Sequence, residues 1–257
     1  MKALVTGGAK RIGRAIALYL AGRGFDVAVH YASSGAEAGQ TVAEIRALGR
    51  NAVALQADLL DEAQLAGLVA AAVQGLGGPL TLLVNNASIF EYDTIASATR
   101  QSWDRHIGSN LRAPFVLTQC FAAQAPKAVL RDGEPVAQGL IVNMIDQRVL
   151  KPTPEFMTYS LAKAGLYALT RTAAQALAPD VRVNGIGPGP TVQGTRQSGS
   201  HFARQRAATI LQRGAGPADV CAAIGFFLES PAVTGQMIAV DGGQHLAWAT
   251  PDVLGIE

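Results

Sequence analysis

Short apolar, β-rich runs alternate along this chain of 257 residues with longer stretches rich in alanine and leucine. The short runs lie at 2–6, 26–31, 51–56, 80–84, 139–144, 181–186 and 236–240. Such alternation is typical of βαβ units, in which a helix connects two parallel strands. Several runs are apolar throughout, as strands are when helices cover both faces of a sheet. The pattern predicts an α/β fold of the Rossmann type, a doubly wound parallel sheet of about seven strands.

Apolar residues at three- and four-residue intervals predict helices over 14–23 and 158–178. A glycine or a proline follows each of them as a stop signal. No linker or repeat interrupts the chain, so we expect one domain over 1–257. Residues 187–200 are rich in Gly, Pro, Ser and Thr and are expected to form one long, functional loop. The substrate loop as a whole is placed at about 187–215.

Composition excludes several classes of function. The 21 basic and 19 acidic residues are scattered and leave a net charge of +2, which does not favour a nucleic-acid partner. Cys120 and Cys221 have no metal-ligand spacing, so we expect packing cysteines and no metal site. No apolar run approaches the ~18 residues of a membrane span, and the chain opens as a strand. We therefore expect no membrane association and a cytoplasmic location.

A glycine-rich turn, Thr6 to Gly13, follows the first predicted strand directly. Gly7 allows a tight turn and Gly13 allows the following helix to pack closely on the strand. Unpaired amides at the start of that helix, together with its dipole, favour a pyrophosphate. A turn of this kind also occurs as an ordinary βα connection, so alone it is weak support for a nucleotide site.

The end of the second predicted strand indicates which dinucleotide the turn would hold. An NAD site usually has an acidic residue there, whereas this chain has Ser33 and Ser34. Their hydroxyls, with Lys10 or Arg11 beside them, are suited to a 2′-phosphate. We therefore expect NADP(H) rather than NAD as the cofactor.

Residues at the ends of the second and third predicted strands are further candidates for the nucleotide site, and the roles of His30 and Asp58 are each open to two interpretations. His30 and Tyr31 end the second strand, where His30 is either a cofactor-lining residue or a partly buried strand-end histidine. Asp58 and Leu59 follow the third strand. The Asp58 carboxylate either meets the adenine amino group or caps the helix that begins near Asp61.

Further motifs occur in a fixed order along the chain: Asn85-Asn86-Ala87-Ser88, then Tyr159 with Lys163, then Pro188-Gly189, then Asp241-Gly242-Gly243. With the glycine-rich turn, this combination resembles the short-chain dehydrogenase/reductase family across nearly the whole chain. Each motif alone is unspecific, and the set is highly specific.

The resemblance implies a catalytic group. Tyr159 and Lys163 are four residues apart and share one face of a helix, so both project into one site. The lysine ammonium is expected to favour the tyrosine phenolate and to reach the nicotinamide ribose. Asn110 matches the family's catalytic asparagine and is expected either to hold a water for proton relay or only to kink its helix.

The resemblance and the turn together imply the cofactor-binding residues. Thr191 is expected to bond the nicotinamide carboxamide. The implied set is Gly7, Lys10, Arg11, Ile12, His30, Tyr31, Ser33, Ser34, Asp58, Leu59, Asn86, Ala87, Ser88, Tyr159, Lys163, Pro188, Gly189 and Thr191.

Two departures from the family pattern sharpen the expected function. Arg11 stands where the turn usually has a second glycine, and Asp146 stands where a catalytic serine is usual. Both resemble the pteridine reductases and bacterial dihydromonapterin reductases of this family, as do Ser88 and Phe90. The resemblance implies a pterin stacked between Phe90 and the nicotinamide.

In this interpretation Arg11 faces the pyrophosphate and the pterin edge, and Asp146 with Tyr159 and a water protonates a ring nitrogen. The open alternatives are Phe90 as a lid residue packed on loop neighbours and Asp146 as a strand-end cap. The implied substrate residues are Arg11, Ser88, Phe90, Asp146, Tyr159 and Pro190.

The predicted function is NADPH-dependent reduction of a 7,8-dihydropterin to a tetrahydropterin, of the dihydromonapterin, dihydrobiopterin or dihydrofolate type. One alternative is a carbonyl or imine reductase acting on another substrate. Another is a regulatory protein that senses NADP(H) without turnover. The resemblance also implies a homotetramer in which helices around 98–127 and 158–178 pair between subunits.

Overall fold

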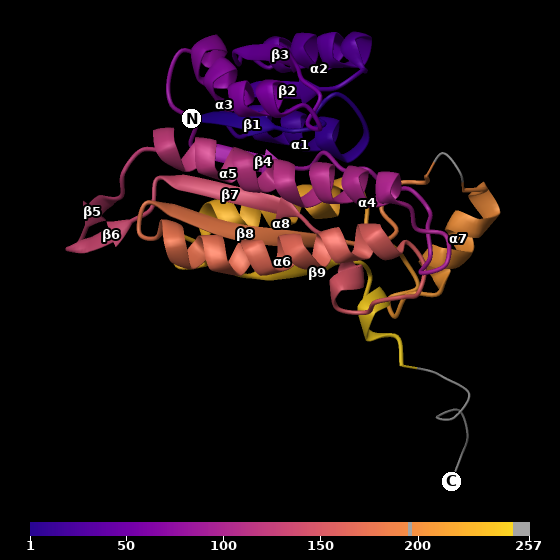
Figure 1. Cartoon of the computed structure of the whole chain (residues 1–257). Coiled ribbons are helices and arrows are strands. Elements are labelled where there is room, and N and C mark those ends of the chain that lie inside the picture. The colour runs from indigo at the N-terminus through magenta and orange to yellow at the C-terminus, as the bar shows by residue number, and fades with distance from the viewer. Residues whose placement is uncertain (195–196, 249–257) are drawn as a thin grey trace.

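The computed structural model describes residues 1–194 and 197–248, which form one seven-stranded sheet with helices around it. The strand order is β3-β2-β1-β4-β7-β8-β9, and every neighbouring pair is parallel (Figure 1). The strands are β1 Lys2–Val5, β2 Asp26–Tyr31, β3 Ala52–Gln56, β4 Leu82–Asn85, β7 Gly139–Met144, β8 Val181–Pro188 and β9 Met237–Val240. The order reverses between β1 and β4, and ligands bind at such a switch point in open α/β sheets.

Two helical layers cover the sheet. One consists of α1 Arg11–Gly22, α2 Gly35–Ala47 and α8 Pro217–Glu229. The other consists of α3 Glu62–Leu76, α5 Ala113–Gln124 and α6 Met157–Leu177. The remaining helices are α4 Arg100–Ile107, the π turn η1 Gly108–Arg112, α7 Gly199–Ala207 and the 3-10 turns η2 Gln147–Val149 and η3 Gln244–Leu246.

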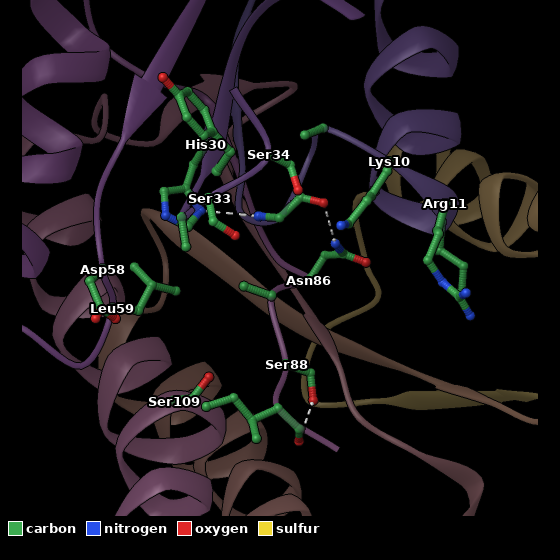
Figure 2. Close-up of a pocket in the computed structure, with 18 of the residues that line it drawn as sticks. Lys10, Arg11, His30, Ser33, Ser34, Asp58, Leu59, Asn86, Ser88 and Ser109 are labelled. Carbon is green, nitrogen blue, oxygen red and sulfur yellow. Dashed lines mark hydrogen bonds between the residues drawn. The ribbon is translucent and has the colours of Figure 1, made fainter. Parts of the chain in front are cut away.

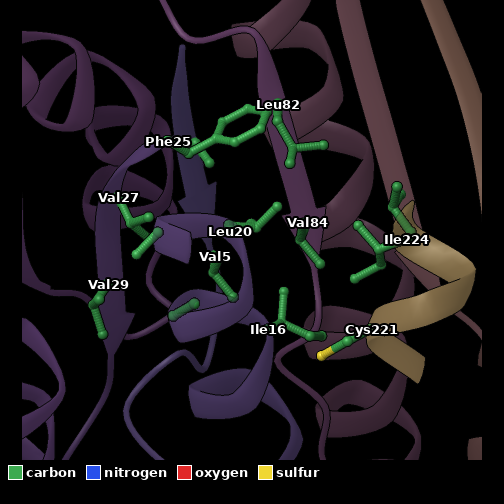
Figure 3. Packing of buried hydrophobic residues seen from close by; sticks show 14 of the residues in the cluster. Val5, Ile16, Leu20, Phe25, Val27, Val29, Leu82, Val84, Cys221 and Ile224 are labelled. Atoms are coloured by element: carbon green, nitrogen blue, oxygen red, sulfur yellow. The ribbon is translucent and has the colours of Figure 1, made fainter. Parts of the chain in front are cut away.

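Alternate residues of each strand point into different cores. Val5 of β1 and Val27 of β2 face the layer of α1 and α8, while Leu4 and Ala28 face the opposite layer. Figure 3 shows the first core, where side chains of the strands meet α1 and α8 and where Cys221 packs beside Ile16. This alternation explains why the strands are apolar almost throughout.

An antiparallel hairpin, β5 Val129–Arg131 and β6 Glu134–Val136, was not expected from the sequence. It projects from the body between α5 and β7 (Figure 1). Its turn residues, Asp132 and Gly133, both have positive φ, of 52° and 85°. Asp-Gly is a strong signal for a two-residue hairpin turn, so the sequence held this information.

Some predicted boundaries were displaced. Helix α1 begins at Arg11 rather than at residue 14. The predicted loop over 187–200 begins later, because Gly187 and Pro188 still pair with β9. It ends at Ser198, which caps α7 by accepting from the His201 amide. Within the predicted substrate loop, residues 195–196 lie outside the described residues.

None of the helices within residues 1–194 and 197–248 is both long enough and apolar enough to cross a bilayer.

Alanine at position 13 is predicted to destabilise the fold, because Gly13 has no room for a Cβ. An added Cβ would lie 2.1 Å from the Gly7 carbonyl oxygen and 2.6 Å from Asn86 Nδ2. We expect Gly13→Ala to lower the free energy of unfolding by about 1–3 kcal/mol, because backbone must move. The control is Gly22→Ala in the same helix, where a Cβ meets nothing within 4 Å. Urea unfolding should leave that variant at or above wild-type stability, and equal losses in both variants would contradict the prediction.

Candidate active site

A cavity of about 440 Å³ opens at the carboxyl ends of β1, β2, β3 and β4 (Figure 2). It brings together much of the predicted cofactor set: Gly7, Lys10, Arg11, Ile12, His30, Tyr31, Ser33, Ser34, Asp58, Leu59, Asn86, Ala87 and Ser88. Lining residues that the sequence analysis gave no role are Ala9, Ala32, Leu60, Ile89 and Ser109.

The glycine-rich turn is held from behind by His30, which is buried. The Gly7 amide donates to His30 Nδ1 at 3.1 Å, and His30 Nε2 lies 3.0 Å from the Ala57 carbonyl oxygen. Because Nδ1 accepts, the proton of the neutral ring is on Nε2 and is donated to Ala57. Burial lowers the pKa of His30, which favours this neutral form. At 2% exposure His30 is buried, not partly buried. Its two bonds link the turn to the residue after β3.

A second set of bonds fixes the turn to the end of β4. Thr6 Oγ1 accepts from the amides of Asn86 and Ala87, at 2.9 and 3.0 Å. The Asn86 side chain donates to the carbonyl oxygens of Thr6 and Gly7. Sequence analysis assigned Thr6 no separate role. Its position at the junction of strand and turn was the available signal.

Arg11 has an unusual backbone for a residue with a side chain, with φ of 56°. Glycine adopts this region without steric cost, which is a physical reason for a glycine at this position. The Arg11 guanidinium donates to the carbonyl oxygens of Gln193 and Val192, at 2.9 and 3.2 Å. In this structure it therefore ties the turn to the loop after β8, a contact that the sequence analysis did not foresee.

Asp58 does not cap a helix, so that alternative was wrong. The cap of α3 is Asp61, whose carboxylate accepts from the amides of Ala63 and Gln64. Asp58 instead accepts from the Leu60 amide at 2.9 Å and lines the cavity.

Asp146 and Tyr159 meet where β7 ends and α6 begins. The Tyr159 hydroxyl donates to Asp146 Oδ2 at 2.6 Å, and Asp146 Oδ1 accepts from the Arg148 amide at 2.8 Å. Asp146 thus caps η2 with one oxygen and bonds the phenol with the other. Burial raises the pKa of Asp146, with the bonds from Tyr159 and Arg148 opposing it.

The pKa of the Tyr159 phenol is raised, whereas Lys163 was expected to lower it by favouring the phenolate. Burial and the Asp146 carboxylate raise it well above 10. The Lys163 ammonium does not offset this, because Nζ lies 5.7 Å from the ring centre and donates to the Met144 carbonyl oxygen at 2.7 Å. Tyr159 is consequently a neutral phenol in this structure, and its high pKa means that the proton is held tightly.

Asn110 lies in the π turn η1, between α4 and α5. Its buried side-chain amide makes two bonds to one residue: Oδ1 accepts from the Ile89 amide at 2.9 Å, and Nδ2 donates to the Ile89 carbonyl at 2.8 Å. The side chain therefore holds the loop after β4 against the helix.

Phe90 is stacked within the protein. Its ring lies parallel to Phe156 with centroids 4.2 Å apart and meets the Tyr159 ring edge-on at 4.7 Å. Phe156 has φ of 54° and lies beside the Arg148 guanidinium, 5.0 Å from its ring centre. Phe156 was not predicted as a site residue, although it lies three residues before Tyr159.

The loop after β8 is closed at its base by an arginine. Arg206 of α7 donates to the carbonyl oxygens of Pro190, Gly214 and Ala215. At the start of this loop the Gly189 amide donates to the Val240 carbonyl oxygen, and the Thr191 hydroxyl donates to the Gly189 carbonyl oxygen. These contacts join the first residues of the predicted substrate loop to its last.

A family model described as short chain dehydrogenase matches residues 1–203. The chain belongs to the short-chain dehydrogenase family. Among solved structures, this short-chain dehydrogenase is similar to FolM alternative dihydrofolate reductase 1 from Brucella suis in complex with NADP, with 44% identity, a TM-score of 0.91 and 98% of each chain covered.

Curated relatives carry other names. The short-chain dehydrogenase/reductase eriH of Hericium erinaceus is 36% identical over 251 residues, covering 94% of this chain and 96% of the relative. The 3-oxoacyl-[acyl-carrier-protein] reductase FabG of Staphylococcus aureus is 33% identical over 249 residues, covering 95% and 98%.

Lys163 of this short-chain dehydrogenase is predicted to lose its proton near pH 8 in the protein without cofactor. Burial lowers its pKa from 10.5 to about 8, and the Asp146 carboxylate opposes that shift. Asp146→Asn removes the opposing charge, so the Lys163 pKa is expected to fall further. NMR of the lysine side chains across a pH series measures both values, with Lys163→Arg identifying the resonance. A Lys163 pKa near 10.5, or one that Asp146→Asn raises, would be the contrary result.

Proposed function

We propose that this short-chain dehydrogenase is an NADPH-dependent reductase that converts a 7,8-dihydropterin to a tetrahydropterin. The observation that carries the proposal is the 2.6 Å contact between the Asp146 carboxyl and the Tyr159 phenol. A carboxyl group suits protonation of a ring nitrogen, whereas a ketone oxygen requires only a hydroxyl partner. The similarity to an alternative dihydrofolate reductase at 44% identity supports the same assignment.

The cavity fits the dinucleotide that we propose. Gly7 has φ of 60°, and a Cβ there would lie 3.1 Å from the Ala87 Cα, so the turn leaves no room for a side chain. This turn leads into the N-terminus of α1, where a pyrophosphate is favoured. No carboxylate lies at the end of β2 in the described part of the cavity. Ser33 and Ser34 stand there instead, and Lys10 lines the cavity from the start of α1. We assign these three side chains to the 2′-phosphate. When bound, NADPH supplies the hydride.

Proton delivery follows from the pair at the end of β7. With Asp146 protonated, its carboxyl donates to the Tyr159 oxygen, and the Tyr159 hydroxyl donates to the pterin ring nitrogen. The raised pKa of Asp146 keeps the acid form present at higher pH than for a free carboxyl. Because only that form donates, the rate falls as pH rises through the raised pKa.

The remaining predicted site residues take positioning roles in this proposal. Phe90, 44% exposed, offers an aromatic surface for the flat pterin beside Tyr159. Ser88 and Pro190 border the substrate, and Thr191 lies near the nicotinamide carboxamide. Asn110 acts through the loop that it bonds, because its amide is paired with the Ile89 backbone.

We also propose that the protein assembles as a cytoplasmic homotetramer through α4, α5 and α6. Trp103, Phe115 and Leu161 on these helices are 44%, 43% and 46% exposed. Large apolar side chains at such exposure suit an interface between copies of the chain.

Cofactor choice is predicted to depend on the missing carboxylate. Ser33→Asp is expected to raise the KM for NADPH about tenfold or more, because a carboxylate repels the 2′-phosphate. Ser33→Asn is the matched control, since it has the same shape without the charge. Initial rates with NADPH and NADH measure the change. Equal KM values for NADPH in the two variants would show that the 2′-phosphate lies elsewhere.

The substrate assignment is tested at residue 146. Asp146→Asn is expected to lower kcat/KM for a 7,8-dihydropterin by about 10²–10⁴-fold, since the amide is no general acid. Asp132→Asn, in the exposed hairpin turn, is the matched control and should retain full activity. The assay follows NADPH absorbance with dihydromonapterin, dihydrobiopterin and dihydrofolate.

Two outcomes would favour the alternatives. If Asp146→Ser improves ketone turnover and leaves dihydropterin turnover unchanged, the protein is a carbonyl reductase, as the name of the FabG relative suggests. If NADPH binds and neither dihydropterins nor ketones are reduced, the protein is a dinucleotide sensor.

A further inference from the structure

Three buried polar side chains, which the proposed mechanism does not use, form a continuous hydrogen-bonded chain. Asp93 is 2% exposed, His106 0% and Thr158 2%. They come from three separate segments: the loop after β4, helix α4 and the first turn of α6. Burial of such groups is unfavourable unless each is hydrogen-bonded, and each of these three side chains has a partner within the chain.

The direction of every hydrogen bond in this chain is fixed. The Glu91 amide donates to His106 Nε2 at 3.1 Å, so that nitrogen carries no proton. His106 Nδ1 then holds the ring proton and donates to Thr158 Oγ1 at 2.7 Å. The Thr158 hydroxyl in turn donates to Asp93 Oδ2, and the Thr158 amide donates to Asp93 Oδ1 at 3.1 Å.

Two members of this chain are sequence neighbours of predicted site residues. Glu91 directly follows Phe90, and Thr158 directly precedes Tyr159. The His106 and Tyr159 ring centroids are 6.0 Å apart, nearly perpendicular at 75°. The His106 side chain thus holds the Glu91 backbone and is also bonded to Thr158, in the helical turn that carries Tyr159.

We propose that His106 is a positioning residue that holds the Phe90 loop in register with Tyr159, and that it does so only as the neutral ring protonated at Nδ1. The proposal rests on the proposed function in one respect, namely that Phe90 contacts the substrate. A protonated ring carries hydrogen on both nitrogens, and its Nε2 hydrogen would then face the Glu91 amide hydrogen. Protonation therefore breaks this bond and loosens the loop at Glu91, which the Arg105 guanidinium still holds through the Glu91 carboxylate at 2.9 Å.

The charged groups around His106 determine the pH at which this loosening occurs. Glu91 and Asp93 on the loop stabilise the protonated ring, and Arg105 on α4 disfavours it. On α6, Tyr159 faces the ring as a neutral phenol. Burial is the largest influence and lowers the pKa of His106 below its usual 6.5. Substrate affinity is consequently expected to fall on the acid side of that value.

The experiment compares two substitutions at His106. His106→Phe keeps an aromatic ring and removes both polar atoms, whereas His106→Gln keeps an acceptor that can reach the Glu91 amide. We expect His106→Phe to raise the KM for the dihydropterin about tenfold, the effect of losing one hydrogen bond that positions the loop. The KM and dissociation constant for NADPH should stay within about twofold, since His106 is not among the residues that line the described cavity. His106→Gln should stay near the wild-type KM and lose the acid-side rise in KM.

Thr158 provides a second test within the same chain. Thr158→Val removes the hydroxyl at nearly constant shape and should resemble His106→Phe, while Thr158→Ser keeps the hydroxyl and should resemble the wild type. Equal losses for NADPH and dihydropterin in His106→Phe and Thr158→Val would overturn the proposal, because a general folding defect would explain them. Wild-type KM values in both would also overturn it.

A measurement without substrate separates this proposal from the proposed function. Nitrogen NMR of histidine-labelled protein distinguishes the two neutral tautomers from the charged ring. A His106 ring protonated only at Nδ1 down to pH 6.5 supports the proposal even if no dihydropterin is reduced. A ring that is charged at that pH, or protonated at Nε2, overturns it even if dihydropterins are good substrates.

Discussion

The hydrogen bond between Asp146 and Tyr159 is the contact on which the arrangement of the site depends. It joins the end of a central strand to the first turn of the longest helix, and it places two groups that compete for one proton 2.6 Å apart. Burial disfavours the charged form of each, which is why the pKa of both is raised. Two positive charges act on Asp146, the Arg148 guanidinium and the buried Lys163 ammonium, and the Asp146 carboxylate in turn stabilises the ammonium. The three groups therefore titrate as a coupled set rather than independently.

Much of the fold was predictable, because the spacing of apolar residues and the positions of Gly and Pro indicate where strands and helices lie. The seven strands of the parallel sheet follow from apolar runs that helices cover on both sides, and the cavity follows from the strand ends that the switch point collects. The hairpin at 129–136 was overlooked although Asp132-Gly133 is a turn signal. Two short strands carry too little apolar pattern to stand out beside long buried ones.

The side-chain contacts were less accessible from the sequence. Arg11 was identified as a departure from the family, but its bonds to Val192 and Gln193 join residues about 180 positions apart. Periodicity has no information on which distant carbonyls a flexible side chain will meet. His30 and His106 are similar cases, because each is a buried neutral ring that accepts from the amide of a functional loop. Only the fold shows that one histidine holds the turn after β1 and the other holds the loop after β4.

The anchors of this site share a property with a consequence for divergence. Four buried side chains accept from main-chain amides of the turn after β1 and the loop after β4. Thr6 bonds the amide of Ala87, His30 that of Gly7, His106 that of Glu91 and Asn110 that of Ile89. Because these bonds go to the main chain, they do not depend on which side chains the turn and the loop carry. New chemistry can be acquired by exchanging residues such as 88 and 90 without rebuilding their supports. Such modularity is a physical route by which relatives that are 33–44% identical keep one architecture under different enzyme names.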